Sequence, residues 1–196
     1  MTVAVEPEAS REHFAREGYA IFRGVLDASL MAEASHHVDW LQARNPGLRP
    51  ELLDHELLGQ DPFWLRLVSD PQLLDVAEQF IGSNIALFAS HYISKPPRDG
   101  KAVLWHQDGS YWPLVPMNVV SLWLSIDHAP PENGCMRVVP RTQAMDLQEM
   151  KKRADLDSVF GSGMDTALVD ESAAAQPEAV MSHVGGDRLF TKVRYR

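Results

Sequence analysis

The pattern of hydrophobic residues changes near residue 85, and this change constrains the fold more than any other feature. Before it, apolar side chains recur at helical spacing, as in the stretch that follows Asp27. After it, short apolar runs alternate with turns rich in Pro and Gly, which is typical of antiparallel strands. The sequence therefore predicts a mainly β, α+β fold in a single domain, with helical support in residues 1–84 and a β core in residues 85–196.

Local signals place the expected elements along the chain. Helices are expected at residues 11–17, after Asp27, and twice within residues 54–80, where Pro62 and Pro71 lie near the helix starts. Strands are expected at residues 18–24, 85–93, 103–106, 119–127 and 135–139. The polar stretch at residues 146–160 predicts a surface helix.

Charge and cysteine content narrow the class of protein. Twenty-seven acidic against 18 basic residues give a net charge of −9, which disfavours nucleic acid as a partner. The single cysteine, Cys135, rules out an internal disulfide framework and suits a reducing cytosol. Residues 109–126 are uncharged, but prolines and polar residues interrupt them, so no membrane span is expected. With no secretion signal at the N-terminus, a cytoplasmic protein is expected.

The sharpest chemical signal is the tetrapeptide Trp105-His-Gln-Asp108. On a strand, alternate side chains point to one face, so His106 and Asp108 would project together. An imidazole and a carboxylate so placed supply two of the three ligands of a 2-His-1-carboxylate site. Such a site leaves open positions on a non-heme Fe(II) for a co-substrate and O₂. The pair is therefore a candidate metal centre.

Several motifs in order give this chain a family resemblance. Residues 94–97 (Ser-Lys-Pro-Pro), 105–113 (Trp-His-Gln-Asp-Gly-Ser-Tyr-Trp-Pro), 122–128 and 132–142, with the opening at residues 14–24, resemble the phytanoyl-CoA dioxygenase family. The resemblance implies a double-stranded β-helix, which is a cupin-like jelly roll. It also implies an oxygenase that uses Fe(II), 2-oxoglutarate and O₂ to hydroxylate a small organic substrate, with release of succinate and CO₂.

The resemblance carries over residue by residue. His106 and Asp108 match two iron ligands, and Trp123 matches an aromatic residue of the 2-oxoglutarate pocket. The family's Pro-Gly-Ser/Thr-His motif reads Pro-Arg-Thr-Gln here, so Arg141 and Gln143 depart from it. We expect this departure to alter a loop and not the metal site.

The C-terminal part of the chain leaves three interpretations open. In the first, His183 is the distal iron ligand, and Arg194 pairs with the far carboxylate of 2-oxoglutarate, a role that suits a forked guanidinium. In the second, the glycine-aspartate turn at residues 186–187 places the distal histidine beyond Arg196, which makes the chain truncated. In the third, an internal segment is missing, because residues 193–195 also resemble the family's last strand.

The remaining predictions concern the pocket and the reaction. His91, Tyr111 and Trp112 are candidate substrate-pocket residues, with an ordinary core position as the alternative for each. The leading function is a non-heme Fe(II)/2-oxoglutarate-dependent dioxygenase that acts on a small molecule. The alternatives are a catalytically inactive jelly-roll binding module and, on the same ligands, a zinc or manganese enzyme. The substrate and the oligomeric state do not follow from the sequence.

Overall fold

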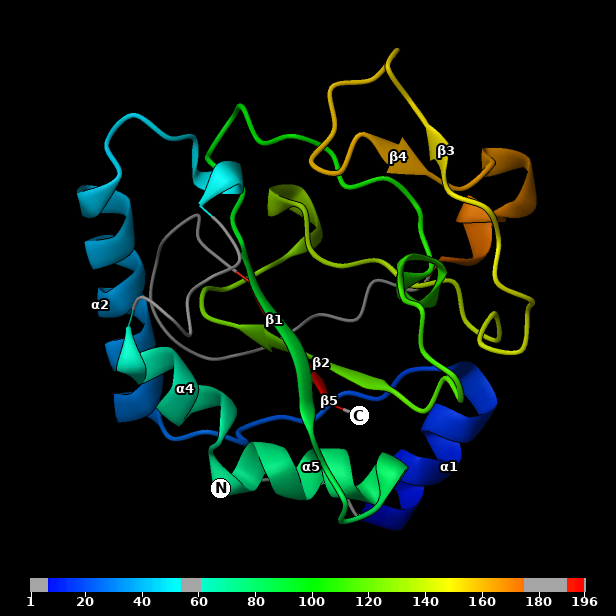
Figure 1. Cartoon of the computed structure of the whole chain (residues 1–196), viewed down its shortest axis with the longest axis horizontal. Helices are drawn as coiled ribbons and strands as arrows, with labels where there is room; N and C mark the ends of the chain where they lie inside the picture. The colour runs from blue at the N-terminus through cyan, green and yellow to red at the C-terminus, as the bar shows by residue number, and fades with distance from the viewer. Residues whose placement is uncertain (1–6, 54–60, 175–189, 196) are drawn as a thin grey trace.

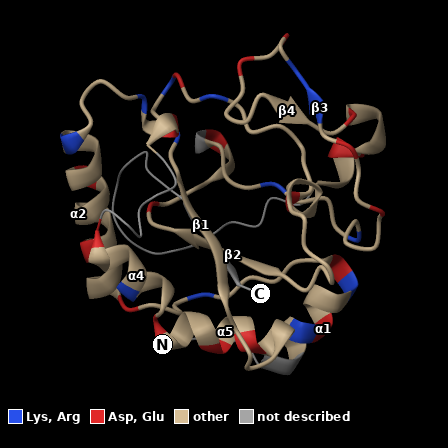
Figure 2. Cartoon of the chain, in the orientation of Figure 1, with Lys and Arg blue, Asp and Glu red and all other residues tan. Residues whose placement is uncertain are grey.

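A computed structural model describes residues 7–53, 61–174 and 190–195 of the 196-residue chain. A helical layer flanks a small central sheet, and loops with short helical turns form the opposite side (Figure 1). Charged residues of both signs are scattered over helices and loops, while β1 and β2 carry none (Figure 2). The strands β1 and β2 thus contribute only uncharged residues to the central sheet.

Within the described residues, four α-helices make up the helical layer. They are α1 (Pro7–Glu17), α2 (Ala28–Arg44), α4 (Pro62–Val68) and α5 (Pro71–Ile81). An aspartate caps α2, α4 and α5: Asp27 accepts from the backbone N–H of Leu30, and Asp61 and Asp70 each accept from the second residue of their helix. Proline occupies the first position of α4 and α5, where its missing N–H costs no hydrogen bond. These predicted helix starts are confirmed.

Among the residues that the structure describes, the main sheet contains three antiparallel strands in the order β1-β5-β2. Its members are β1 (Leu87–Ile93), β5 (Phe190–Tyr195) and β2 (Val120–Ser125). The C-terminal strand β5 therefore lies in the middle, with Arg194 opposite Ala89 on one side and Ser121 on the other. A second, two-stranded sheet pairs β3 (Lys151–Lys152) with β4 (Ser162–Gly163). The predicted strands at 85–93 and 119–127 are confirmed within two residues at each end.

Short 3-10 turns connect these elements. They are η1 (Pro50–Leu52), η2 (Asp108–Tyr111), η3 (Pro131–Asn133), η4 (Thr166–Leu168) and η5 (Glu171–Ala173). Gly134 ends η3 with a φ of 84°, a left-handed conformation that glycine adopts without strain. A Cβ atom at this position would also lie 3.2 Å from Nζ of Lys95, whose pKa is lowered by burial.

The core lies between the helical layer and one face of the sheet. Trp64 and Leu67 of α4 and Val38 of α2 pack in one buried cluster with Tyr92 of β1 and Leu124 of β2. Burying a large apolar side chain contributes roughly 1.5–3 kcal/mol, so this cluster is the main source of attraction between the layers. On the other side of β2, Trp123 packs against a separate cluster formed by Ala129 and Cys135.

Four sequence-based element predictions are wrong. Residues 18–24 and 135–139 contain no strand, and residues 103–106 are extended beside a single bridge at Ala102. Residues 146–160 form β3 and irregular backbone in place of a helix. There the Gln107 side chain accepts from the Gln148 backbone N–H at 2.7 Å and so satisfies a group that a helix would use itself.

Among the described helices, none is both long enough and sufficiently apolar to cross a lipid bilayer.

Candidate metal centre and adjoining cavity

The predicted pair His106 and Asp108 meets in the structure. Although no strand forms here, Gln107 has extended backbone angles (φ −107°, ψ 123°), which turn its two neighbours to the same side. The Nε2 atom of His106 lies 3.3 Å from Oδ1 of Asp108. About one fifth of each side chain is exposed, so the pair is shielded but reachable.

A hydrogen bond at Nδ1 of His106 determines which ring nitrogen carries the proton and which one can accept. Nδ1 lies 2.7 Å from the carbonyl oxygen of Leu104, which only accepts hydrogen bonds. Nδ1 therefore carries the proton in the neutral ring, and Nε2 keeps its lone pair. A lone pair and a carboxylate oxygen repel each other unless a cation or a proton lies near both. The arrangement fits a divalent metal, and an oriented second nitrogen is usual for metal-binding histidines.

The second carboxylate oxygen of Asp108 is held by the central sheet. The hydroxyl of Ser121, on β2, donates to Oδ2 of Asp108 at 3.3 Å. Ser121 also lies opposite Arg194 in the register of β2 and β5. The backbone of Arg194, which is predicted to bind 2-oxoglutarate, thus lies next to Ser121, which orients Asp108.

The segment that carries the pair is held by residues 158–164. The backbone N–H of Val159 donates to the Ala102 carbonyl at 2.9 Å, and that of Met164 donates to the Trp105 carbonyl at 2.8 Å. The ring of Phe160 meets the His106 ring edge to face, with 5.7 Å between centroids. These contacts fix the backbone on one side of the motif.

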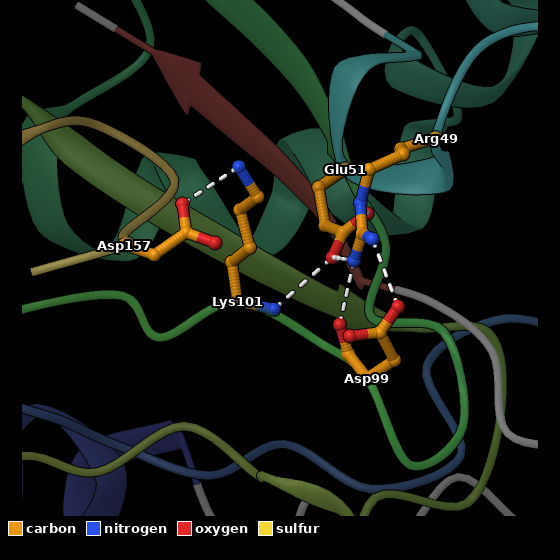
Figure 3. A network of polar contacts seen from close by, with 5 residues as sticks. All are labelled: Arg49, Glu51, Asp99, Lys101 and Asp157. Carbon is orange, nitrogen blue, oxygen red and sulfur yellow. Dashed lines mark hydrogen bonds and ion pairs between the residues drawn. The ribbon is translucent and has the colours of Figure 1, made fainter.

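A polar network fixes the same segment at its start (Figure 3). The buried Glu51 carboxylate accepts from the Arg49 guanidinium at 2.9 Å and from the Lys101 backbone N–H at 3.0 Å. Arg49 also binds the Asp99 side chain at 2.8 Å, and Nζ of Lys101 lies 2.7 Å from a carboxylate oxygen of Asp157. The network therefore ties η1 to residues 99–101 and, through the Lys101 side chain, to Asp157.

A cavity of about 350 Å³ adjoins Asp108. Its walls come from residues 14–25, from α5, from all six residues of β2 and from Met136 and Val138. Most of these side chains are apolar. Asp108 is the single acidic or basic side chain among the described lining residues.

The other predicted site residues are distributed unevenly around this cavity. Trp123 lines it, whereas His91, Tyr111 and Trp112 are absent from its described lining. His91 lies on β1, Tyr111 binds the Ser162 hydroxyl at 3.0 Å, and the Trp112 ring packs against Phe88. The substrate-pocket role of these three residues stays a prediction.

The third iron ligand, expected at His183, stays a prediction. His183 lies outside the described residues, and Arg194 is described only by its backbone in β5. Within the described part of the chain, no group of three metal-binding side chains converges. Sequence reasoning missed Ser121 and the Leu104 carbonyl, because nothing local marks a hydroxyl or a backbone carbonyl as a partner of a distant site.

Arg141 and Gln143, which depart from the family motif, both contact the C-terminal end of α1. Arg141 (φ 66°) places its guanidinium 3.0 Å from the Glu17 carboxylate, and its backbone N–H donates to the Glu17 carbonyl at 2.9 Å. The amide of Gln143 donates to the Ala15 and Arg16 carbonyls at 3.0 and 3.3 Å. Both residues therefore fasten the C-terminal end of α1.

Comparison with known proteins settles the family. The family model for phytanoyl-CoA dioxygenase (PhyH) matches residues 14–185, which is most of the chain and includes the His106 and Asp108 pair. The chain belongs to the phytanoyl-CoA dioxygenase family. Among curated relatives, the peroxisomal phytanoyl-CoA dioxygenase of Bos taurus is 36% identical over 93 residues, covering 45% of this chain and 28% of that protein.

A second curated relative gives a similar match. The probable alpha-ketoglutarate-dependent hypophosphite dioxygenase of Stutzerimonas stutzeri is 34% identical over 105 residues, covering 52% of this chain and 36% of that protein. The chain thus aligns with 28% and 36% of the length of these two relatives.

Solved structures show the fold. The epimerase SnoN, in complex with Fe3+, alpha ketoglutarate and nogalamycin RO, matches with a TM-score of 0.70 at 20% identity, over 96% of this chain and 82% of that one. EctD from S. alaskensis with bound Fe matches with a TM-score of 0.70 at 19% identity, over 100% and 72%. The predicted jelly-roll fold of the phytanoyl-CoA dioxygenase family is confirmed.

Proposed function

We propose that the protein is a non-heme oxygenase that uses Fe(II) and 2-oxoglutarate to hydroxylate a small organic substrate with O₂, releasing succinate and CO₂. The observation that carries the proposal is the approach of Nε2 of His106 to Oδ1 of Asp108, at 3.3 Å. Family membership and the iron- and 2-oxoglutarate-containing structures of similar fold support the same reaction class.

The residues present fit an iron ion. An imidazole held in one tautomer and a carboxylate oriented by a hydroxyl are the nitrogen and oxygen donors of a facial triad. Bound Fe(II) would supply the redox chemistry with O₂ and 2-oxoglutarate. His183 is the candidate for the third ligand.

The chain's own part in the reaction is to hold and orient. The Leu104 carbonyl keeps the proton on Nδ1 of His106, and the Ser121 hydroxyl keeps Asp108 directed toward the same point. Trp123, in the cavity wall, and Arg194, opposite Ser121, are the candidates for contact with 2-oxoglutarate. The apolar walls limit access of water to the reacting region.

The proposal also covers the domain organisation, the compartment and the partners of the protein. We infer a single cytoplasmic domain over residues 1–196, with a small molecule and O₂ as partners. The net charge of −9 and the single cysteine support a partner other than nucleic acid and a reducing compartment.

A second candidate is a catalytically inactive jelly-roll module that binds a small molecule. It is favoured by the described residues, which bring together two metal-binding side chains and no third. Two protein ligands would hold iron weakly. The two candidates therefore differ in whether the chain binds iron and 2-oxoglutarate together.

An anaerobic titration with Fe(II) and 2-oxoglutarate separates them. The chelate gives a weak visible charge-transfer band, which we expect to saturate at one iron per chain. His106→Ala should abolish the band, because it removes a ligand. His36→Ala is the matched control, since His36 lies exposed on α2.

Each outcome decides between the candidates. If folded wild-type protein gives no saturable band, the oxygenase proposal is wrong and the inactive module stands. If His106→Ala gives the wild-type band, the iron site lies elsewhere. Loss of the band in His183→Ala would support His183 as the third ligand, and an unchanged band would remove it.

A further inference from the structure

Gln107 lies between the two predicted iron ligands, His106 and Asp108. We propose that Gln107 is a positioning residue for this pair. Its side chain fastens the reverse side of the metal-binding segment to residues 146–148 and so holds the two ligands in the geometry that a metal ion needs. This role rests on the proposed function, because it concerns how tightly the chain binds its metal.

The backbone at Gln107 sets the relative direction of both ligands. A single residue separates His106 from Asp108, so its φ and ψ angles determine how the two side chains lie relative to each other. At −107° and 123°, they turn both ligands to one side of the segment and the Gln107 side chain to the other. Residues 103–107 belong to none of the strands in the described part of the chain, so other contacts must fix these angles.

The Gln107 side chain binds residues 146–148 as a neighbouring strand would. Its Oε1 atom accepts from the backbone N–H of Gln148 at 2.7 Å, and its Nε2 atom donates to the Asp146 carbonyl at 3.4 Å. A side-chain amide offers a donor and an acceptor, as a backbone peptide does. The shorter bond is partly buried, which shields it from competition by water.

The residue between these two contacts packs next to the other neighbour of Asp108. A Cβ atom at Gly109 would lie 3.0 Å from Cδ2 of Leu147, so the Leu147 side chain occupies the space that this glycine leaves open. Gln107 and Gly109 flank Asp108 in the sequence. Residues 146–148 therefore contact the segment on both sides of the carboxylate ligand.

The chain that receives Gln107 is itself anchored. The backbone N–H of Met145 donates to the Thr142 carbonyl at 3.1 Å, and the Thr142 hydroxyl donates to the Val139 carbonyl at 2.7 Å. The next residue, Gln143, binds two carbonyls at the end of α1. Loss of the Gln107 amide would therefore detach the metal-binding segment from a fixed support and free the angles that direct its two ligands.

Metal affinity in the absence of O₂ and 2-oxoglutarate measures this role without turnover. Anaerobic titration with Co(II), followed by its visible absorption, reports both affinity and coordination geometry. Gln107→Leu removes both hydrogen bonds, and we expect it to bind Co(II) at least about tenfold more weakly and with an altered spectrum, as is usual when a group that orients a ligand is lost. Gln72→Leu, the same change at an exposed position of α5, is the matched control and should bind as the wild type does.

A change on the other side of the 2.7 Å bond tests the same contact. Gln148→Pro removes the backbone N–H that Gln107 accepts from. It should weaken Co(II) binding as Gln107→Leu does, and the double variant should bind no more weakly than either single variant, because both changes break one bond. Amide hydrogen exchange at Gln148 should also be faster in Gln107→Leu than in the wild type.

The outcomes separate this role from the oxygenase proposal. If the wild type binds Co(II) and folded Gln107→Leu binds it equally tightly with the same spectrum, the positioning role is wrong and the iron site stands. Losses that add in the double variant would also overturn the role. Should Gln107→Leu fail to fold, Gln148→Pro decides in the same way. If the wild type binds neither Co(II) nor Fe(II), the oxygenase proposal fails and the positioning role fails with it.

Discussion

Residue 163 shows how closely the chain packs against the metal-binding segment. A Cβ atom at Gly163 would lie 2.8 Å from the Leu104 Cβ and 3.2 Å from the Trp105 carbonyl oxygen. Contacts this short force the neighbour to move. Because Leu104 and Trp105 directly precede His106, a shift here also moves the carbonyl that orients the His106 ring.

Gly163→Ala should therefore destabilise the protein and weaken the metal pair. We expect the free energy of unfolding to fall by about 1–3 kcal/mol, the usual cost of overpacking. Urea unfolding measures this. Gly47→Ala is the matched control, since no atom lies within 4 Å of its Cβ position. Equal unfolding midpoints for the two variants would show that the contact at residue 163 carries no cost.

Gln143 has a comparable role at the end of α1. Its amide donates to two carbonyls in the last turn of α1, those of Ala15 and Arg16. We expect Gln143→Ala to lower the free energy of unfolding by about 0.5–1.5 kcal/mol, as for one ordinary hydrogen bond. Faster amide exchange at Gly18, whose N–H donates to the Phe14 carbonyl, should accompany the loss.

The control for this prediction is Gln72→Ala, at an exposed position in the first turn of α5. If exchange at Gly18 is the same in both variants, Gln143 does not hold the helix end.

Local chemistry explains which site residues the sequence revealed. The spacing of His106 and Asp108 is visible in the tetrapeptide itself, and the extended backbone of Gln107 realises it. Ser121 lies 13 residues away from Asp108 along the chain, and their contact depends on how β2 packs beside η2. That packing is a tertiary property, so the sequence could not supply it.

At the scale of elements, the buried Glu51 carboxylate makes η1 sensitive to acid. Burial alone would raise the pKa of Glu51, but hydrogen bonds from the Arg49 guanidinium and the Lys101 backbone N–H outweigh it and hold the pKa below its ordinary value of 4.5. A carboxylate with a lowered pKa stabilises the fold above its unfolded-state pKa. This stability is lost as the pH falls through the lower, folded-state value.

Glu51→Gln should remove that dependence. At pH 7 we expect the variant to lose about 1.5–3 kcal/mol of stability, as for a hydrogen bond to a charged group. Below pH 4.5 the gap to the wild type should narrow, because the wild-type carboxyl becomes protonated as well. Thermal unfolding at a series of pH values measures the gap. Glu149→Gln, at an exposed position, is the control, and a gap that is constant with pH would contradict the prediction.

The elements that the sequence predicted correctly are those with local signals. Aspartate caps and first-turn prolines mark the starts of α4 and α5, because both act through neighbouring backbone groups. The expected helix at residues 146–160 failed for the opposite reason. Its backbone groups bind the Gln107 side chain, 41 residues away from Gln148 along the chain, and the strand β4, which follows it.

At the scale of the whole molecule, the position of β5 was the least accessible to sequence reasoning. Residues 190–195 pair with β1 and β2, which lie about 100 and 70 positions earlier in the chain. The sequence of a six-residue strand does not indicate which other strands it pairs with. Its central position puts Arg194 in register with Ser121.

The cavity beside Asp108 also links what the protein binds to how stably it folds. Its walls come from residues 14–25, from α5 and from β2, so one bound molecule would contact three separate parts of the chain. A molecule that binds the native state and not the unfolded chain shifts the folding equilibrium toward the native state by mass action. Occupancy of the cavity therefore raises the temperature at which the helical layer and the sheet separate.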